Sequence, residues 1–184
     1  MSPYAGVVFF AGSVPIVWLS RRSLLRPASH GFYRFFAFEA LLALVVLNAP
    51  LWFVHPFAPR QLVSWVLLLV SAVVVLWAVV LLHRRGKSRP TAEGSPVFAW
   101  ENTQSLVTTG IYRYIRHPMY LSLLLLTWGV LLKSVSAGTL VLAGVATLAL
   151  AAAARAEEAE NVARFGQDYR DYMKRTRRFV PFVL

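Results

Sequence analysis

The amino-acid sequence predicts an all-α, polytopic membrane protein with about five transmembrane helices. Of its 184 residues 58% are hydrophobic and only 15% are charged, and the mean hydropathy is +0.57, which is too apolar for a soluble globular domain. Five apolar runs cover 4–20, 35–54, 62–82, 120–132 and 137–154. The chain has no cysteine, which excludes disulfides, thiolate metal sites and a cysteine nucleophile.

The lengths of the runs predict which of them cross a bilayer. A spanning helix needs about 20 residues, so the second and third runs are long enough, and the first and fifth need short extensions. No basic residue precedes the first run, so we expect a span there and not a signal peptide. The fourth run has only 13 residues. Either residues 110–119 continue that helix outward, or it starts inside the headgroup layer with its polar start held by protein.

The basic residues predict the orientation. Of 19 Lys and Arg residues, 17 follow the first, third or fifth run, and only Arg60 and Lys133 lie in the opposite loops. Cytoplasmic loops carry the positive excess, so we expect an outside N-terminus and a cytoplasmic C-terminus. This topology explains the net charge of +11 without a nucleic-acid partner, and it favours contact with anionic headgroups.

We expect a single membrane domain, 1–184, in four parts. These are three N-terminal spans (1–82), a cytoplasmic loop and motif (83–118), a helical hairpin (119–154) and a cytoplasmic C-terminal helix and tail (155–184). Only residues 133–136 join the hairpin helices, so their open ends should lie side by side. The tail has apolar residues at helical spacing, typical of an amphipathic helix on a membrane surface that Gly166 bends or breaks: Val162, Phe165, Tyr169, Tyr172 and Met173.

Polar residues gather where the hairpin opens. Pro118 suits the first turn of a helix, so Arg116 and His117 would flank a helix N-terminus, a favourable place for an anion. The alternative is that these residues are positive-inside anchors. Adjacent carboxylates, Glu157 and Glu158, follow the fifth run, where a helix C-terminus disfavours them unless positive groups compensate. The alternative there is a solvated charge run.

These segments resemble a known superfamily. Residues 106–112 read Leu-Val-Thr-Thr-Gly-Ile-Tyr and 116–120 read Arg-His-Pro-Met-Tyr; Glu157-Glu158 and Phe165-Gly166-x2-Tyr169-x2-Tyr172 follow. The pattern is similar to the isoprenylcysteine carboxyl methyltransferase and phospholipid methyltransferase superfamily. The resemblance implies an S-adenosylmethionine (SAM) site, open to the cytosol, between the hairpin and the C-terminal helix. The residues it assigns to the cofactor are Gln104, Leu106, Val107, Tyr112, His117, Pro118, Met119, Tyr120 and Glu157.

The resemblance also implies catalytic residues and a lipid-like or prenylated substrate from the bilayer. A carboxylate acceptor needs no base, whereas an amine needs one, for which His117 and the pair Glu157 and Glu158 are the candidates. Arg178 begins a terminal motif that would assist the substrate or anchor the tail. The arginine that isoprenylcysteine enzymes carry four residues before the glutamates is Ala153 here, and whether Arg155 replaces it stays open. The acceptor therefore stays open between an isoprenylcysteine-type carboxylate and a phospholipid-type amine.

Two other functions remain possible from the sequence. An NADPH-dependent sterol-type reductase has a similar Arg-His-Pro-x-Tyr motif, and a non-catalytic membrane subunit would tolerate His117→Ala and Glu157→Ala. A Rossmann route to SAM is excluded because the chain has no Gly-x-Gly pair. His30, His55 and His83 stand isolated, and no metal site is expected. The richness in Ala, Leu, Val and Arg suggests a bacterial cytoplasmic membrane.

Overall fold

A computed structural model describes residues 3–86 and 105–180, and it confirms the all-α prediction for that part of the chain. The elements, in chain order, are α1 (Pro3–Leu24), α2 (His30–Asn48), the short 3-10 helix η1 (Ala49–Leu51), α3 (Pro59–Arg85), the 3-10 helix η3 (Gly110–Arg113), α4 (Pro118–Leu131), α5 (Ala137–Phe165) and α6 (Gln167–Arg175).

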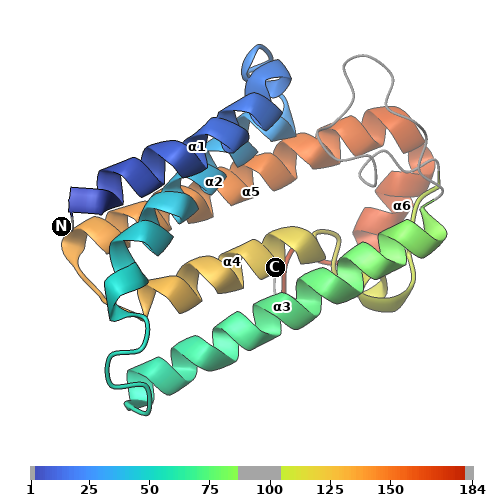
Figure 1. Ribbon diagram of the computed structural model, residues 1–184. Helices are drawn as coiled ribbons and strands as arrows, with labels where there is room; N and C mark the ends of the chain where they lie inside the picture. The colour runs from blue at the N-terminus through green and yellow to red at the C-terminus, as the bar shows by residue number, and fades with distance from the viewer. Residues whose placement is uncertain (1–2, 87–104, 181–184) are drawn as a thin grey trace.

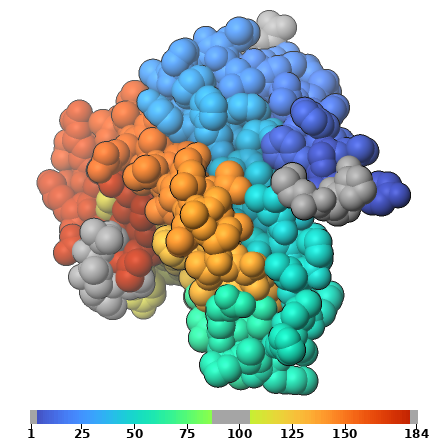
Figure 2. All heavy atoms as spheres, turned by 90° about the vertical axis from the view of Figure 1, so that its left-hand side faces the viewer, coloured from blue at the N-terminus to red at the C-terminus, as the bar shows by residue number. Residues whose placement is uncertain are grey.

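The long helices lie side by side in the order α1, α2, α5, α4, α3 (Figure 1). Each end of this row therefore belongs to the N-terminal half of the chain, and the α4–α5 hairpin fills its centre. Seen from the end that carries the N-terminus, α5 lies between the first two helices on one side and α3 on the other (Figure 2). At the opposite end of the bundle, α6 packs against α5 (Figure 1).

Among the described residues, four helical stretches are long and apolar enough to cross a membrane: α1, α2 together with η1, α3 and α5. The outer helices present large apolar side chains to the outside, such as Phe10 on α1 and Leu69 on α3. Such side chains suit a lipid environment. At 14 residues α4 is too short to span alone, so five transmembrane helices stay a prediction, and the described residues show four long apolar helices and one short one.

The start of α4 decides between the two alternatives for this short helix. Residues 110–119 do not extend the helix outward, because η3 and a bend precede Pro118, the first residue of α4. The polar start is held by protein instead. The backbone N–H of Arg116 donates to the Arg177 carbonyl at 2.7 Å, and that of His117 donates to the Arg178 carbonyl at 3.1 Å.

The fifth apolar run, 137–154, is only the first part of α5, which runs on to Phe165 as a single helix of 29 residues. Gly166, with a φ of +60°, ends α5 and separates it from α6. This confirms the expected break at Gly166. The aromatic face of α6 does not lie on a membrane surface at Tyr169 and Tyr172, since both side chains are buried in the protein.

Small residues bring the central helices together. Ala37 of α2 and the pair Ala153 and Ala154 of α5 are buried in one cluster with Tyr120 of α4. Alanine side chains let helix backbones approach closely, which favours helix packing in membranes. This close packing sets the C-terminal part of α5 against the start of α4, where the polar residues gather.

Candidate active site

A glycine turn and the C-terminal segment fix the motif before α4. Gly110 has a φ of +63°, and a Cβ at this position would lie 2.5 Å from the Leu81 side chain, so the turn requires glycine. The chain then passes through η3 into an extended stretch where Ile115 pairs with Arg177 in a parallel bridge. This pairing places His117 at the N-cap of α4 with its side chain in the interior.

Glu158 joins three segments. Its carboxylate accepts a hydrogen bond of 2.8 Å from Arg116 Nε and two from Arg178, of 3.1 Å from Nε and 2.5 Å from Nη2. The same Arg116 side chain donates to the Thr176 carbonyl. The hydrogen bond to Glu158 raises the pKa of Arg178, so this guanidinium stays charged. The positive groups that the sequence required beside the carboxylates are therefore Arg116 and Arg178.

Glu157 and His117 face each other across the site. Glu157 Oε1 lies 3.8 Å from His117 Nδ1, and the other ring nitrogen, Nε2, lies 3.5 Å from a Glu158 oxygen. The imidazole is stacked on Tyr120 with ring centroids 5.4 Å apart. The ring is buried, with Nδ1 toward Glu157 and Nε2 toward Glu158. His117 therefore lies between the two carboxylates of α5.

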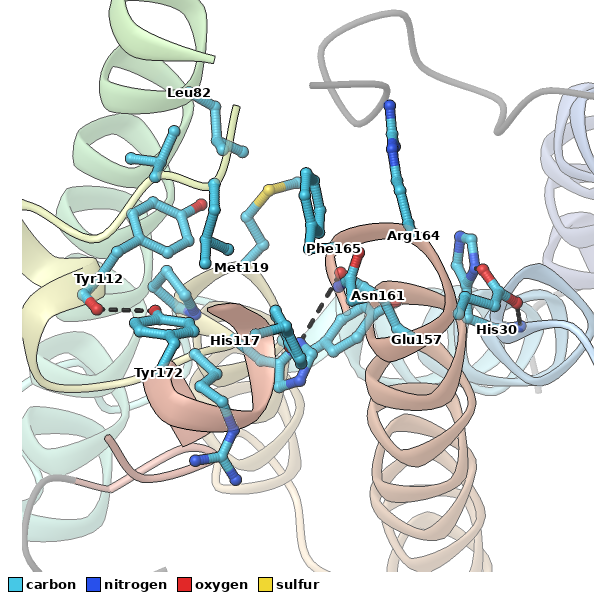
Figure 3. A pocket seen from close by; sticks show the side chains of 17 residues that line it. His30, Leu82, Tyr112, His117, Met119, Glu157, Asn161, Arg164, Phe165 and Tyr172 are labelled. Atoms are coloured by element: carbon cyan, nitrogen blue, oxygen red, sulfur yellow. Dashed lines mark hydrogen bonds and ion pairs between the residues drawn. The ribbon is translucent and has the colours of Figure 1, made fainter. Parts of the chain in front are cut away.

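A pocket of about 220 Å³ opens at this end of the bundle (Figure 3). Eight of the nine residues that the resemblance assigns to the cofactor line it: Leu106, Val107, Tyr112, His117, Pro118, Met119, Tyr120 and Glu157. The ninth, Gln104, lies outside the described residues. Among the residues expected to be catalytic, His117 and Glu157 line the pocket, whereas Glu158 and Arg178 do not and bond each other.

Aromatic side chains of α6 close one side of the pocket. Tyr169 and Tyr172 line it, and the Tyr172 hydroxyl donates 2.7 Å to the Tyr112 carbonyl. Burial raises the pKa of Tyr169 to about 12 and raises that of Tyr172 as well, so both phenols remain neutral at physiological pH. The sequence motif contains these tyrosines, but we expected them on the membrane face of the tail.

The sequence reasoning missed a polar group on the α2 side of the pocket. His30, Glu160, Asn161 and Arg164 all line the pocket. His30 Nδ1 lies 2.6 Å from Glu160 Oε2, and the His30 backbone N–H donates 3.0 Å to the other oxygen of the same carboxylate. Figure 3 shows Glu157, Asn161 and Arg164 along α5, with His30 beyond them. Because 130 residues separate His30 from Glu160, no local sequence pattern predicts their contact.

Ala153, where isoprenylcysteine enzymes carry an arginine, lies away from the pocket and is fully buried between helices. Arg155 is exposed and does not line the pocket either. The last residue of the terminal motif, Pro181, lies outside the described residues.

The sequence is similar to known methyltransferases. The sequence model of the phospholipid methyltransferase family matches residues 59–168. Methanethiol S-methyltransferase of Crocosphaera subtropica is 33% identical over 76 residues, which are 41% of this chain and 29% of that protein. Methanethiol S-methyltransferase 2 of Bradyrhizobium diazoefficiens is 36% identical over 78 residues, which are 42% of this chain and 29% of that protein.

The matched part of the chain thus spans less than a third of the length of either relative. No solved structure matches the chain. The family match covers more than half of the sequence and includes α3, the motif before α4, the α4–α5 hairpin and Gly166. The protein, with its long apolar helices, is an integral membrane protein and belongs to the phospholipid methyltransferase family.

Proposed function

We propose that this protein is a SAM-dependent methyltransferase whose reaction takes place in the pocket between α4, α5 and α6. One observation carries the proposal. Of the nine residues that the resemblance assigns to the cofactor, the eight that are described come from the motif before α4, from α4 and from α5, and all eight line this pocket.

The residues present suit the chemistry of SAM. When bound, SAM supplies an electrophilic methyl group on a sulfonium, together with a carboxylate, an amino group and ribose hydroxyls. The rings of Tyr112, Tyr169 and Tyr172 offer aromatic faces, which attract a cation. Glu157 offers a carboxylate to amino or hydroxyl donors, and the buried His117 ring lies beside it in the pocket lining.

The site favours an acceptor that lacks a carboxylate. Isoprenylcysteine enzymes are expected to hold the substrate carboxylate with an arginine, and this chain has the buried Ala153 in its place and an exposed Arg155. A lipid-borne amine, the acceptor type of the family, fits better. A small thiol is the second candidate, because the relatives of 33% and 36% identity are named methanethiol S-methyltransferases.

The distribution of charge supports a reaction on the cytoplasmic face. The α1–α2 connection, the C-terminal end of α3 and the segment after α5 lie at the pocket end of the bundle (Figure 1). Basic residues from these segments surround the pocket end, whereas Lys133 lies in the α4–α5 connection at the other end. By the positive-inside rule the pocket then faces the cytoplasm.

Calorimetric titration of the detergent-purified protein with S-adenosylhomocysteine tests the proposal. A separate titration with NADPH tests the reductase alternative. We expect S-adenosylhomocysteine to bind, and His117→Ala and Glu157→Ala each to weaken its binding about 10-fold or more. Arg155→Ala is the matched control, because this exposed residue lies on the same helix outside the pocket. Binding of NADPH alone would favour the reductase, and absence of binding by either ligand would favour a non-catalytic subunit.

A further inference from the structure

Methyl transfer to an amine or a thiol requires the removal of a proton from the acceptor. An ammonium group has no free electron pair, and a thiol is a far weaker nucleophile than its thiolate. Either acceptor must therefore lose a proton before or during methyl transfer, and a positioned base nearby accelerates that step. Glu158 is held by two guanidinium groups, and His117 is the residue expected to contact the cofactor.

The α2 side of the pocket holds a second histidine with the geometry of a base. One carboxylate, Glu160, bonds both the His30 ring at Nδ1, at 2.6 Å, and the His30 backbone N–H, at 3.0 Å. A carboxylate on Nδ1 fixes the tautomer that carries its proton there, and the lone pair is then on Nε2. The ring orientation is also fixed, because the same residue is held at two points.

The position of His30 suits an acceptor that comes from the bilayer. His30 is the first residue of α2, a helix long enough to span the membrane, and α2 packs along α5. The imidazole lines the pocket and is mostly buried, at 13% side-chain exposure. The charged groups that face it are Glu160 and Glu157 from α5 and Arg34 from the next turn of α2.

We propose that the His30–Glu160 pair takes the proton from the methyl acceptor, which is consequently an amine or a thiol and not a carboxylate. This inference rests on the proposed function. His30 Nε2 accepts the proton from the N–H or S–H group, and the freed electron pair forms the new bond to the methyl carbon. The bond between that carbon and the sulfonium sulfur breaks, and the sulfur keeps the electron pair as a neutral thioether. The Glu160 carboxylate balances the imidazolium, which releases its proton to water.

A structural role for the pair is the competing explanation, and Ser29 provides the matched control for it. The Ser29 hydroxyl caps the same end of α2 by accepting a hydrogen bond from the Phe32 N–H. Ser29→Ala therefore weakens this helix end without removing a titratable group. If His30 only anchors α2, Ser29→Ala and His30→Gln should have similar effects.

The test measures methyl transfer from SAM to an amine-headed phospholipid and to a small thiol, across pH, for the unaltered protein and for His30→Gln, Glu160→Gln and Ser29→Ala. For whichever acceptor is methylated, we expect His30→Gln to lower kcat about 100-fold near neutral pH. Part of that loss should be regained at high pH, where the acceptor loses its proton to the solvent without help from a base. Glu160→Gln should move the acidic limb of the pH profile, and Ser29→Ala should leave kcat within about twofold of the unaltered protein.

S-adenosylhomocysteine affinity is the readout that does not depend on activity, and it should stay unchanged in all three variants. A uniform loss at every pH, shared by Ser29→Ala or accompanied by weaker S-adenosylhomocysteine binding, would assign a structural role to His30 and overturn the inference. Full activity of His30→Gln would overturn it while leaving the proposed function intact. Absence of both binding and methyl transfer in the unaltered protein would overturn the proposed function, and this inference with it.

Discussion

Glu157 and Glu158 are neighbours in the sequence but face different partners. Glu157 lines the pocket with an oxygen 3.8 Å from His117 Nδ1, whereas Glu158 is buried between the guanidinium groups of Arg116 and Arg178. Successive residues of an α-helix point about 100° apart, so one pair of carboxylates serves two sides of α5. Glu158 therefore connects α5 to the C-terminal segment, and we propose that Glu157 binds the ligand.

The buried position of Glu158 between two guanidinium groups predicts a large loss of stability when it is substituted, compared with an exposed residue of the same helix. Glu158→Ala leaves two charged groups without their partner and should lower the free energy of unfolding by roughly 2–3 kcal/mol. Arg155→Ala, at an exposed position of the same helix, should change it by less than about 0.5 kcal/mol. Denaturation followed by circular dichroism in detergent measures both values. Equal stability of the two variants would contradict the structural role of Glu158.

The turn at Gly110 predicts a second pair of outcomes. Gly110→Ala introduces a Cβ at a φ of +63° and against Leu81, so it should cost about 2 kcal/mol of stability and weaken S-adenosylhomocysteine binding. Gly144→Ala is the control, since a Cβ there meets no atom within 4 Å and the position lies inside α5. We expect that control to be neutral or slightly stabilising. A harmless Gly110→Ala would show that the turn does not require glycine.

The buried tyrosines predict a dependence of stability on alkaline pH. Burial raises the pKa of Tyr169 to about 12, against 10.0 for an exposed tyrosine. Below pH 10 the phenol is protonated in both the folded and the unfolded chain, so its contribution is fully present. Between pH 10 and 12 only the unfolded chain ionises, so stability falls as the pH rises.

Phenolate absorbance of the folded protein measures this directly. We expect part of the phenolate absorbance to appear only near pH 12, and Tyr169→Phe to reduce that late fraction. A single transition that includes every tyrosine while the protein stays folded would contradict the buried position of Tyr169.

At the other end of the bundle, a lysine lies against two tryptophans. Lys133 is buried, and its Nζ lies 3.3 Å from the Trp65 ring centroid and 5.5 Å from that of Trp52. Trp65→Leu should lower the free energy of unfolding by about 2 kcal/mol, because the ammonium loses its aromatic face. In a protein that already carries Lys133→Met, Trp65→Leu should lower the free energy of unfolding by about 1 kcal/mol less than it does in the unaltered protein. Purely additive effects would exclude a cation–π contribution.

The helices could be predicted from the sequence because apolar runs have few other structures in a membrane. The end of α5 could not, because the polar stretch after Ala154 suggested a boundary. Residues 155–165 are rich in Ala, Glu and Arg, which are good helix formers, so the helix leaves the apolar region and continues to Gly166.

The grouping of the residues that the resemblance assigns to the cofactor could be predicted from the sequence. All of them except Glu157 lie in one stretch, residues 104–120. The acceptor side could not be predicted. Contact between His30 and Glu160 depends on how α2 packs along α5, and each residue looks isolated or solvated in its own segment. Likewise, the sequence placed Tyr169 and Tyr172 on the membrane face, because helical spacing identifies an apolar face but not what covers it.

We propose that methyl transfer takes place in the pocket lined by Glu157 and His117. The most direct test incubates the purified protein with SAM that carries an isotopically labelled methyl group, together with a total lipid extract or a small thiol, and identifies labelled products by mass spectrometry. We predict a labelled amine or thiol product with the unaltered protein and at least about 10-fold less with Glu157→Ala. No labelled product from a protein that binds S-adenosylhomocysteine, or equal product from Glu157→Ala, would contradict the claim.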